Sequence, residues 1–289
     1  MLRPDGPSVD APAGRRAGVV GSPVAHSLSP VLHRAAYSAL GLHGWTYDAR
    51  EVPAGALAAH VETLGPEWVG LSVTMPGKEE ALALATVRGE EAELTGAANT
   101  LVRTEEGWRA DNTDVHGLRT ALAEAGATSP RTATVLGGGA TARSALVALR
   151  GLGVERVDVL VRDRLRPETG VLLDRLGLPV TVGRLGDGPL LLDTRHTEVV
   201  VSTLPGVAPA PDVAPGGPGR APVLLDVVYA PWPGPFARAV RELGPEAPEV
   251  ARGTGMLLHQ AVRQVELMTG HDGPVEAMRA ALVAAGEDA

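Results

Sequence analysis

Hydrophobic and polar positions follow two patterns in the first third of the chain, where continuous apolar runs predict strands and i, i+3, i+4 spacing predicts helices. Strands are predicted over residues 17–21, 45–52, 68–75 and 97–104. Helices are predicted over residues 29–40 and 78–87, and a third between the second and third strands. In the first helix, Ser29 is the expected N-cap and Pro30 the first helical residue, and Gly41 ends it. This alternation indicates an α/β fold with a largely parallel sheet.

A second block of the same kind begins near Pro130. Residues 132–153 predict a strand, a glycine-rich turn and a helix. Further strands are predicted over residues 156–162, 198–204 and 222–229. The last two are continuously apolar, as expected where both faces of a sheet are covered. The Pro/Gly-rich stretch over residues 206–222 predicts a surface loop, and a helical region runs from residue 253 to the C-terminus.

The turn in the second block carries a nucleotide-binding pattern. In VLGGGATARSAL, Gly137, Gly139 and Ala142 satisfy G-x-G-x-x-A between an apolar strand and a helix. The first glycine permits the tight turn, the second lets the backbone approach a pyrophosphate at the helix N-terminus, and the alanine allows close packing. Because the chain has 36 glycines, the pattern alone would be weak, but its position between strand and helix favours a dinucleotide site.

The end of the next strand bears on the choice of cofactor. In VLVRDRLR, Arg162, Arg164 and Arg166 surround Asp163. An acid at this position binds the ribose of NAD, whereas arginine accommodates the 2′-phosphate of NADP. The arginines favour NADP, while Asp163 and the alternative of a solvated arginine-rich turn keep NAD open.

Composition excludes several classes of function. The 289 residues carry a formal net charge of −8, which disfavours a general nucleic-acid binder. No apolar run reaches the length that spans a bilayer, and the first 16 residues predict a disordered lead without a secretory signal. The chain has no cysteine, and its eight histidines show no metal-binding spacing. We therefore expect a cytoplasmic protein that binds no metal, nucleic acid or membrane.

Lys78 is the only lysine among the 26 lysines and arginines of the chain, and it follows a Pro-Gly turn. Arginine stays protonated in proteins, whereas lysine can exchange a proton. A position that keeps lysine in an arginine-rich chain therefore favours proton chemistry. The alternative is a surface lysine in the first turn of a helix.

Small polar residues gather at predicted strand ends, where ligands bind in α/β sheets. Ser27 and Ser29 stand just before a helix and suit an anion such as a carboxylate, although for these two residues alone an N-cap serine with a bystander is the better explanation. The only two asparagines, Asn99 and Asn112, lie near Asp114. Each asparagine could instead form an Asx-turn.

The motifs GSPVAHSLSP, SVTMPGK, GAANTL and DNTD, the glycine turn and GTGMLLHQA occur in this order. Together they resemble the shikimate dehydrogenase family over nearly the whole chain after about Arg16. The resemblance implies a two-domain α/β enzyme, with an N-terminal substrate domain and a Rossmann-type dinucleotide-binding domain. It also implies reversible, NADP-dependent reduction of 3-dehydroshikimate to shikimate in aromatic amino-acid biosynthesis.

The resemblance also implies roles for individual residues. Lys78 and Asp114 would form the catalytic pair. The substrate would contact Ser27, Ser29, Thr74, Lys78, Asn99, Asp114, Tyr229 and Gln260. The cofactor would contact Gly137, Gly138, Gly139, Ala140, Thr141, Arg162, Arg164, Arg166, Val227 and Gly253. Gln260 would reach the substrate across the cleft, whereas Gln264 is expected at the surface.

Three departures from the family pattern stand out. Ser72 replaces a frequent asparagine, VRDR replaces the usual N-R-T/S after the second nucleotide strand, and STLPG replaces a more polar loop. The second departure weakens the NADP assignment. None removes a residue assigned to chemistry.

The expected organisation is a substrate domain over residues 17–115, a nucleotide domain over residues 116–253, and C-terminal helices over residues 254–289 that complete the first domain. A monomer or a homodimer is expected. Two alternatives stay open: a dehydrogenase for quinate or an amino analogue of shikimate, and a sensor that binds NADP and a metabolite without turnover. Intact Lys78 and Asp114 argue against the sensor.

Overall fold

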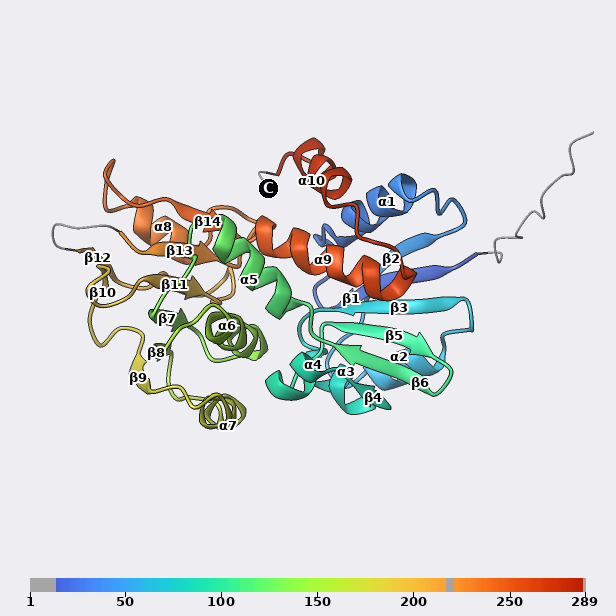
Figure 1. Ribbon diagram of the computed structural model, residues 1–289, viewed down its shortest axis with the longest axis horizontal. Coiled ribbons are helices and arrows are strands. Elements are labelled where there is room, and N and C mark those ends of the chain that lie inside the picture. The colour runs from blue at the N-terminus through green and yellow to red at the C-terminus, as the bar shows by residue number, and fades with distance from the viewer. Residues whose placement is uncertain (1–13, 217–220, 288–289) are drawn as a thin grey trace, which may run out of the picture.

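In the computed structural model, which describes residues 14–216 and 221–287, the strands form two six-stranded sheets and one strand pair (Figure 1). The first sheet contains β1 (Arg16–Gly21), β2 (Thr46–Glu51), β3 (Trp68–Val73), β4 (Val87–Arg88), β5 (Thr100–Thr104) and β6 (Gly107–Asp111). Its order is β2-β1-β3-β5-β6-β4. The prediction of a largely parallel sheet holds for this half with one exception, because β5 runs antiparallel to both β3 and β6 while the other pairings are parallel. The short segment between β5 and β6 makes a hairpin, which reverses the chain direction.

The second sheet has the arrangement expected of a dinucleotide-binding fold. It contains β7 (Thr132–Leu136), β8 (Arg156–Val161), β9 (Val180–Arg184), β11 (Val199–Ser202), β13 (Val223–Asp226) and β14 (Val250–Arg252). All its pairings are parallel, in the order β14-β13-β11-β7-β8-β9. In chain order this is 6-5-4-1-2-3, so the direction of winding reverses between β7 and β11. Ligands bind at such a reversal, beyond the carboxyl ends of the strands.

Ten helices lie in the described part of the chain. They are α1 (Ser29–Ala39), α2 (Leu57–Glu62), α3 (Lys78–Leu84), α4 (Glu90–Thr95), α5 (Asp114–Glu124), α6 (Ala140–Gly151), α7 (Pro167–Leu176), α8 (Pro235–Arg241), α9 (Thr254–Thr269) and α10 (Val275–Ala284). Figure 1 shows α5 and α9 running between the two sheets. None of the helices within residues 14–216 and 221–287 has the length and apolar character needed to cross a membrane.

The C-terminal helices pack against the first half of the chain. Leu32 and Ala36 of α1 share a buried cluster with Leu258 of α9 and with Met278 and Leu282 of α10. The first sheet therefore receives its covering helices from both ends of the sequence. The strands of the first sheet lie before residue 112, and those of the second sheet lie after residue 131.

Several local predictions change in the structure. Leu28 rather than Ser29 is the N-cap of α1, and Ser29 is its first helical residue. The helix predicted to reach residue 87 ends at Leu84, and Val87 begins β4. In the predicted Pro/Gly-rich loop, Val213–Pro215 forms β12, which pairs with β10 (Leu190–Leu192). Most of the predicted N-terminal lead lies outside the described residues, and its last residue, Arg16, belongs to β1.

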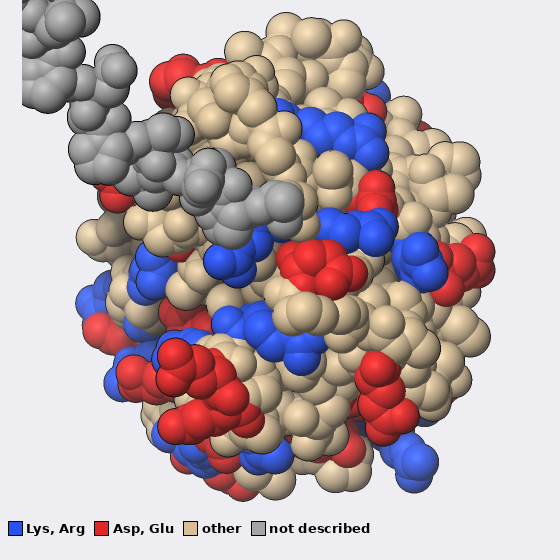
Figure 2. Space-filling model, turned by 90° about the vertical axis from the view of Figure 1, so that its right-hand side faces the viewer, with Lys and Arg blue, Asp and Glu red and all other residues tan. Residues whose placement is uncertain are grey.

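Figure 2 shows that basic and acidic side chains are interspersed on the face at the right of Figure 1. Ion pairs such as Arg16 with Asp48 (2.9 Å) and Arg109 with Asp111 (2.7 Å) bring opposite charges together. Such alternation of sign gives no continuous positive field for a nucleic-acid backbone on this face.

Candidate active site

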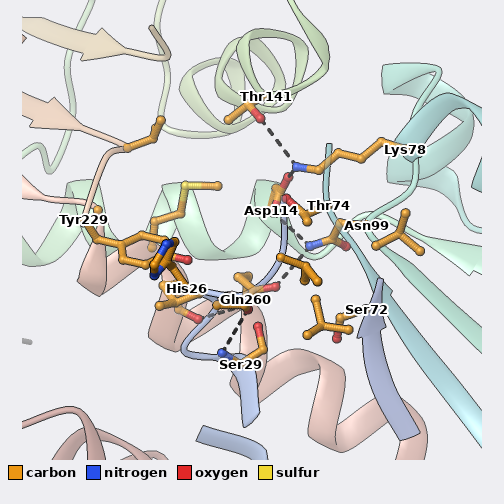
Figure 3. Close-up of a pocket in the computed structure, with 18 of the residues that line it drawn as sticks. His26, Ser29, Ser72, Thr74, Lys78, Asn99, Asp114, Thr141, Tyr229 and Gln260 are labelled. Carbon is orange, nitrogen blue, oxygen red and sulfur yellow. Dashed lines mark hydrogen bonds and ion pairs between the residues drawn. The ribbon is translucent and has the colours of Figure 1, made fainter. Parts of the chain in front are cut away.

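A cavity of about 350 Å³ lies where the two halves of the chain meet (Figure 3). Every residue predicted to contact substrate lines it: Ser27, Ser29, Thr74, Lys78, Asn99, Asp114, Tyr229 and Gln260. Three residues of the predicted cofactor set line it too: Thr141, Val227 and Gly253. The structure therefore brings together side chains from segments that are more than 200 residues apart.

Lys78 and Asp114 form an ion pair in this cavity. β3 ends at Val73, and the turn that follows places Lys78 at the first position of α3. Its Nζ donates to Asp114 Oδ2 at 2.5 Å and lies 3.4 Å from the hydroxyl of Thr141. The two side chains are 14% and 6% exposed, so water screens their attraction only weakly. Asp114 is also the first residue of α5, where a negative charge is favourable.

Asn99 holds the second oxygen of the Asp114 carboxylate. Its Nδ2 donates to Asp114 Oδ1 at 2.8 Å and lies 3.2 Å from Gln260 Oε1. Asn99 is buried, and its Oδ1 accepts a bond from the backbone N–H of Thr113. Asp114 is thus held from two sides, by Lys78 and by Asn99, which fixes its orientation. Asn112 forms an Asx-turn, because its Oδ1 accepts a hydrogen bond from the backbone N–H of Asp114.

Two serines and a tyrosine line other parts of the cavity. The hydroxyl of Ser27 accepts a bond from the backbone N–H of Ser29 at 3.3 Å, at the start of α1. Ser29 is buried, and Pro30 follows it in the first turn. Tyr229 follows β13, and burial raises the pKa of its phenol, so the group stays a neutral donor. This end of the cavity offers uncharged hydroxyls beside the N-terminus of a helix, and both features suit a carboxylate.

A buried polar network behind the cavity was not predicted. The amide of Gln264 accepts from Ser72 Oγ (2.6 Å) and donates to the backbone oxygen of Asn99 (3.1 Å). Ser72 in turn accepts from the hydroxyl of Tyr47 at 2.6 Å. His33 lies 3.3 Å from Gln264, and burial lowers the pKa of its imidazole to about 3, so the ring is neutral. The prediction that Gln264 lies at the surface is wrong, because its residue is 1% exposed.

The glycine turn has the geometry that its sequence predicted. Gly137 has φ +109°, which disfavours a side chain, and a Cβ there would clash with Thr203 after β11. Gly139 is the N-cap of α6, and a Cβ on it would meet no atom within 4 Å. The start of α6 has no acidic residue in its first turn and no side-chain cap. Its N–H groups are therefore available to an anion.

The three arginines that follow β8 lie on the surface, on the same side of the sheet as the glycine turn. They do not line the cavity. Arg162, Arg164 and Arg166 are exposed, and Arg166 is the N-cap of α7. Asp163 contacts Arg162 at 3.2 Å and Arg184 at 3.8 Å. Asp163 is thus engaged with two guanidinium groups, and Arg184 adds a fourth arginine that the sequence did not suggest. This donor set fits a phosphate better than a ribose hydroxyl.

Predicted and observed lining residues differ in two ways. Gly137, Gly138, Gly139, Ala140 and the three arginines lie outside the cavity, toward the glycine turn and the end of β8. Conversely, the cavity includes His26, Ser72, Met256, Leu257 and Gln264, which were given no role. Within the described residues, no group of three or more His, Cys, Asp or Glu side chains could hold a metal ion.

Comparison with known proteins confirms the resemblance. Residues 19–101 match the shikimate dehydrogenase substrate binding domain, and residues 253–283 match the shikimate 5′-dehydrogenase C-terminal domain. A relative from Symbiobacterium thermophilum, shikimate dehydrogenase (NADP(+)), is 35% identical over an alignment of 286 residues that covers 95% of each chain.

Solved structures give the same result for the fold. Mycobacterium tuberculosis shikimate dehydrogenase is 45% identical, with a TM-score of 0.78, and the match covers 93% of this chain and 99% of that one. Thermus thermophilus shikimate 5-dehydrogenase, solved in complex with NADP(H) and shikimate, is 30% identical, with a TM-score of 0.76, and the match covers 94% and 99%. The two α/β halves, the cavity between them and these similarities agree: the chain belongs to the shikimate dehydrogenase family.

Proposed function

We propose that this chain is an NADP-dependent shikimate dehydrogenase, which interconverts 3-dehydroshikimate and shikimate on the way to chorismate and the aromatic amino acids. The observation that carries the proposal is the Lys78–Asp114 pair, whose side chains are 2.5 Å apart within a cavity that Ser27 and Ser29 also line. Shikimate carries a carboxylate and ring hydroxyls, and this cavity offers a partner for each.

The substrate carboxylate would bind at the start of α1. Ser27 and Ser29 supply hydroxyl donors there, and the helix N-terminus favours a negative charge. The ring hydroxyls would meet Thr74, Asn99 and Asp114, which line the same cavity. A substrate held at both ends has one orientation, which places one ring carbon next to Lys78.

Lys78 and Asp114 would handle the proton of the reaction. As the ketone is reduced, negative charge develops on its oxygen, and the Lys78 ammonium can stabilise that charge and donate a proton to it. In the oxidation direction the neutral amine accepts the proton from the substrate hydroxyl. Asp114 holds the Lys78 Nζ by the short contact and is itself held by Asn99.

The residues present fit NADP. The pyrophosphate would bind at the glycine turn and the open start of α6, which comprise Gly137, Gly138, Gly139, Ala140 and Thr141. The 2′-phosphate would be held by Arg162, Arg164 and Arg166. Val227 and Gly253 line the cavity on the side of the second sheet. The bound nicotinamide would supply or accept the hydride. A side chain at position 253 would clash with the backbone oxygen of Val227, so glycine keeps these segments in close contact.

A spectrophotometric assay of the purified protein tests this proposal. Shikimate, quinate and an amino analogue of shikimate are each offered with NADP+ or NAD+, and formation of the reduced nicotinamide is followed. We expect turnover with shikimate and NADP+, and much weaker turnover with NAD+.

Other outcomes point to specific alternatives. Faster turnover with quinate or the amino analogue would replace the substrate assignment, and turnover with NAD+ alone would replace the cofactor assignment. Binding of NADP without any turnover would favour a sensor. A cytoplasmic location and a monomeric or homodimeric state stay predictions, to be checked by cell fractionation and by sedimentation.

A further inference from the structure

Arg143 is one of the largest fully buried side chains among the described residues. It lies in the first half of α6 and its residue is 1% exposed. Its Nε donates to the backbone oxygen of Thr95 at 2.5 Å, and its Nη2 lies 3.4 Å from the backbone oxygen of Gly96. The same Nη2 contacts Glu79 Oε1 at 2.7 Å. Arg143 therefore joins the helix that follows the glycine turn to two helices of the substrate half.

The charge of Arg143 suits these partners. Thr95 ends α4 and Gly96 caps it in the left-handed conformation, so their carbonyl oxygens lie at the negative end of a helix. Glu79 provides the formal negative charge and remains half-exposed. A planar guanidinium can meet several acceptors in a fixed geometry, which the single ammonium of lysine cannot do.

The segment that Arg143 holds also contacts both members of the Lys78–Asp114 pair. The backbone N–H of Ala98 donates to the backbone oxygen of Lys78 at 2.8 Å. The next residue, Asn99, donates to the Asp114 carboxylate at 2.8 Å. Residues 95–99 thus connect Arg143 at one end to both members of the pair at the other. Glu79, the partner of Arg143, is the chain neighbour of Lys78.

A second contact, between Ser144 and Asn112, also joins α6 to the substrate half. Ser144, next to Arg143 on α6, lies 3.1 Å from the Nδ2 of the buried Asn112. Asn112 also donates to the backbone oxygen of Ala97, and its Oδ1 accepts from the N–H of Asp114. The contacts of Arg143 and of Ser144 therefore both link α6 to residues that hydrogen-bond to Lys78 or Asp114.

We propose that Arg143 is a positioning residue that sets the distance and orientation between the cofactor-binding turn and the Lys78–Asp114 pair. This inference rests on the proposed function and adds a residue that touches neither substrate nor cofactor. Hydride transfer requires the two ligands to meet in one geometry, and a misplacement of about 1 Å can cost about 100-fold in rate. Arg143 fixes that geometry because it joins the two binding halves directly.

The test compares Arg143→Lys with wild type in kcat, in KM for shikimate, in the dissociation constant of NADPH from fluorescence, and in the deuterium isotope effect of shikimate labelled at the reacting carbon. We expect kcat to fall about 10- to 100-fold, with much smaller changes in KM and NADPH binding. The isotope effect on kcat should rise, because a misaligned hydride step limits turnover more strongly.

Two further variants keep the test decisive. Glu79→Gln changes a half-exposed partner, leaves the fold intact, and should shift kcat and the isotope effect in the same direction but less. Arg131→Lys changes an arginine whose ion pair with Glu155 is exposed and distant from the site, and should leave both unchanged.

The outcomes separate a positioning role from a structural one. Loss of folded protein alone lowers kcat in proportion to the active fraction and leaves the isotope effect at the wild-type value. That result in both Arg143→Lys and Glu79→Gln would overturn the proposal. Absence of shikimate oxidation in the wild type would instead contradict the proposed function.

Discussion

At the scale of single residues, the active site depends on polar side chains that hold one another. Gln264 shows this best, because its amide is buried and meets Ser72 on one side and the backbone of Asn99 on the other. A further bond reaches the hydroxyl of Thr100 at 3.0 Å. Buried polar groups of this kind contribute little when paired but cost much when a partner is removed.

Gln264→Leu should therefore lower the free energy of unfolding by about 1–3 kcal/mol, since it removes the acceptor of the buried Ser72 hydroxyl and one of the two donors to the carbonyl of Asn99. Urea unfolding followed by circular dichroism measures this. The matched control is Arg263→Ala, the preceding residue, whose side chain is 48% exposed. Equal stability of the two variants would show that the network does not contribute.

Some residue assignments followed from the sequence and others could not. The rarity of lysine and asparagine singled out Lys78 and Asn99, and both line the cavity. Gln264 could not be placed, because helical spacing describes which residues share a face and not what that face meets. Ser29 was misread as a cap because serine before proline is typical of an N-cap, whereas the helix begins one residue earlier.

At the scale of elements, we expect the end of β8 to decide the choice between NADP and NAD. Arg162, Arg164 and Arg166 are exposed there, and Asp163 is occupied by neighbouring guanidinium groups. An element that ends in several guanidinium groups favours an additional phosphate on the ribose.

Changing Arg162 and Arg164 together to alanine should raise KM for NADP+ by at least about 10-fold, because charge-assisted hydrogen bonds to the 2′-phosphate are lost. KM for NAD+ should change little. Steady-state kinetics with both cofactors measure the ratio, and Arg156→Ala, at the opposite end of β8, is the control. If KM rises equally for both cofactors, the cluster acts on something other than the 2′-phosphate.

Elements were predictable where burial dictates the sequence. β7, β8, β11 and β13 are rich in Val, Leu and Ala and lie in the interior of the second sheet, and their patterns were recognised. β9, by contrast, is an exposed edge strand without an apolar run. The antiparallel pairing of β5 also depends on partners that local pattern does not specify.

At the scale of the whole molecule, one buried group in each half makes stability depend on pH, in opposite directions. Burial lowers the pKa of His33 to about 3, so between this value and 6.5 the unfolded chain binds a proton that the native state does not. Stability therefore rises with pH over that interval. Burial raises the pKa of Asp226 from 3.8 to about 6, so the native state binds the proton and stability falls as pH rises.

Variants that remove each titration should expose these opposing slopes. From about pH 4 to 6, the stability of wild type relative to His33→Gln should rise by up to about 1.4 kcal/mol per pH unit, and relative to Asp226→Asn it should fall by a similar amount. Urea unfolding at a series of pH values gives both differences. Profiles that run parallel to the wild type in both variants would contradict the assignment of these buried groups.

The proposed reaction depends on proton exchange by Lys78, the single lysine of the chain, at the junction of the two halves. The most direct measurement is the turnover of Lys78→Arg with saturating shikimate and NADP+, compared with wild type. Arginine keeps the charge and can still contact Asp114, but it does not release its proton. We predict that kcat falls by at least about 100-fold while NADP+ binding is retained. Turnover close to that of the wild type would contradict the account, because charge alone would then be sufficient.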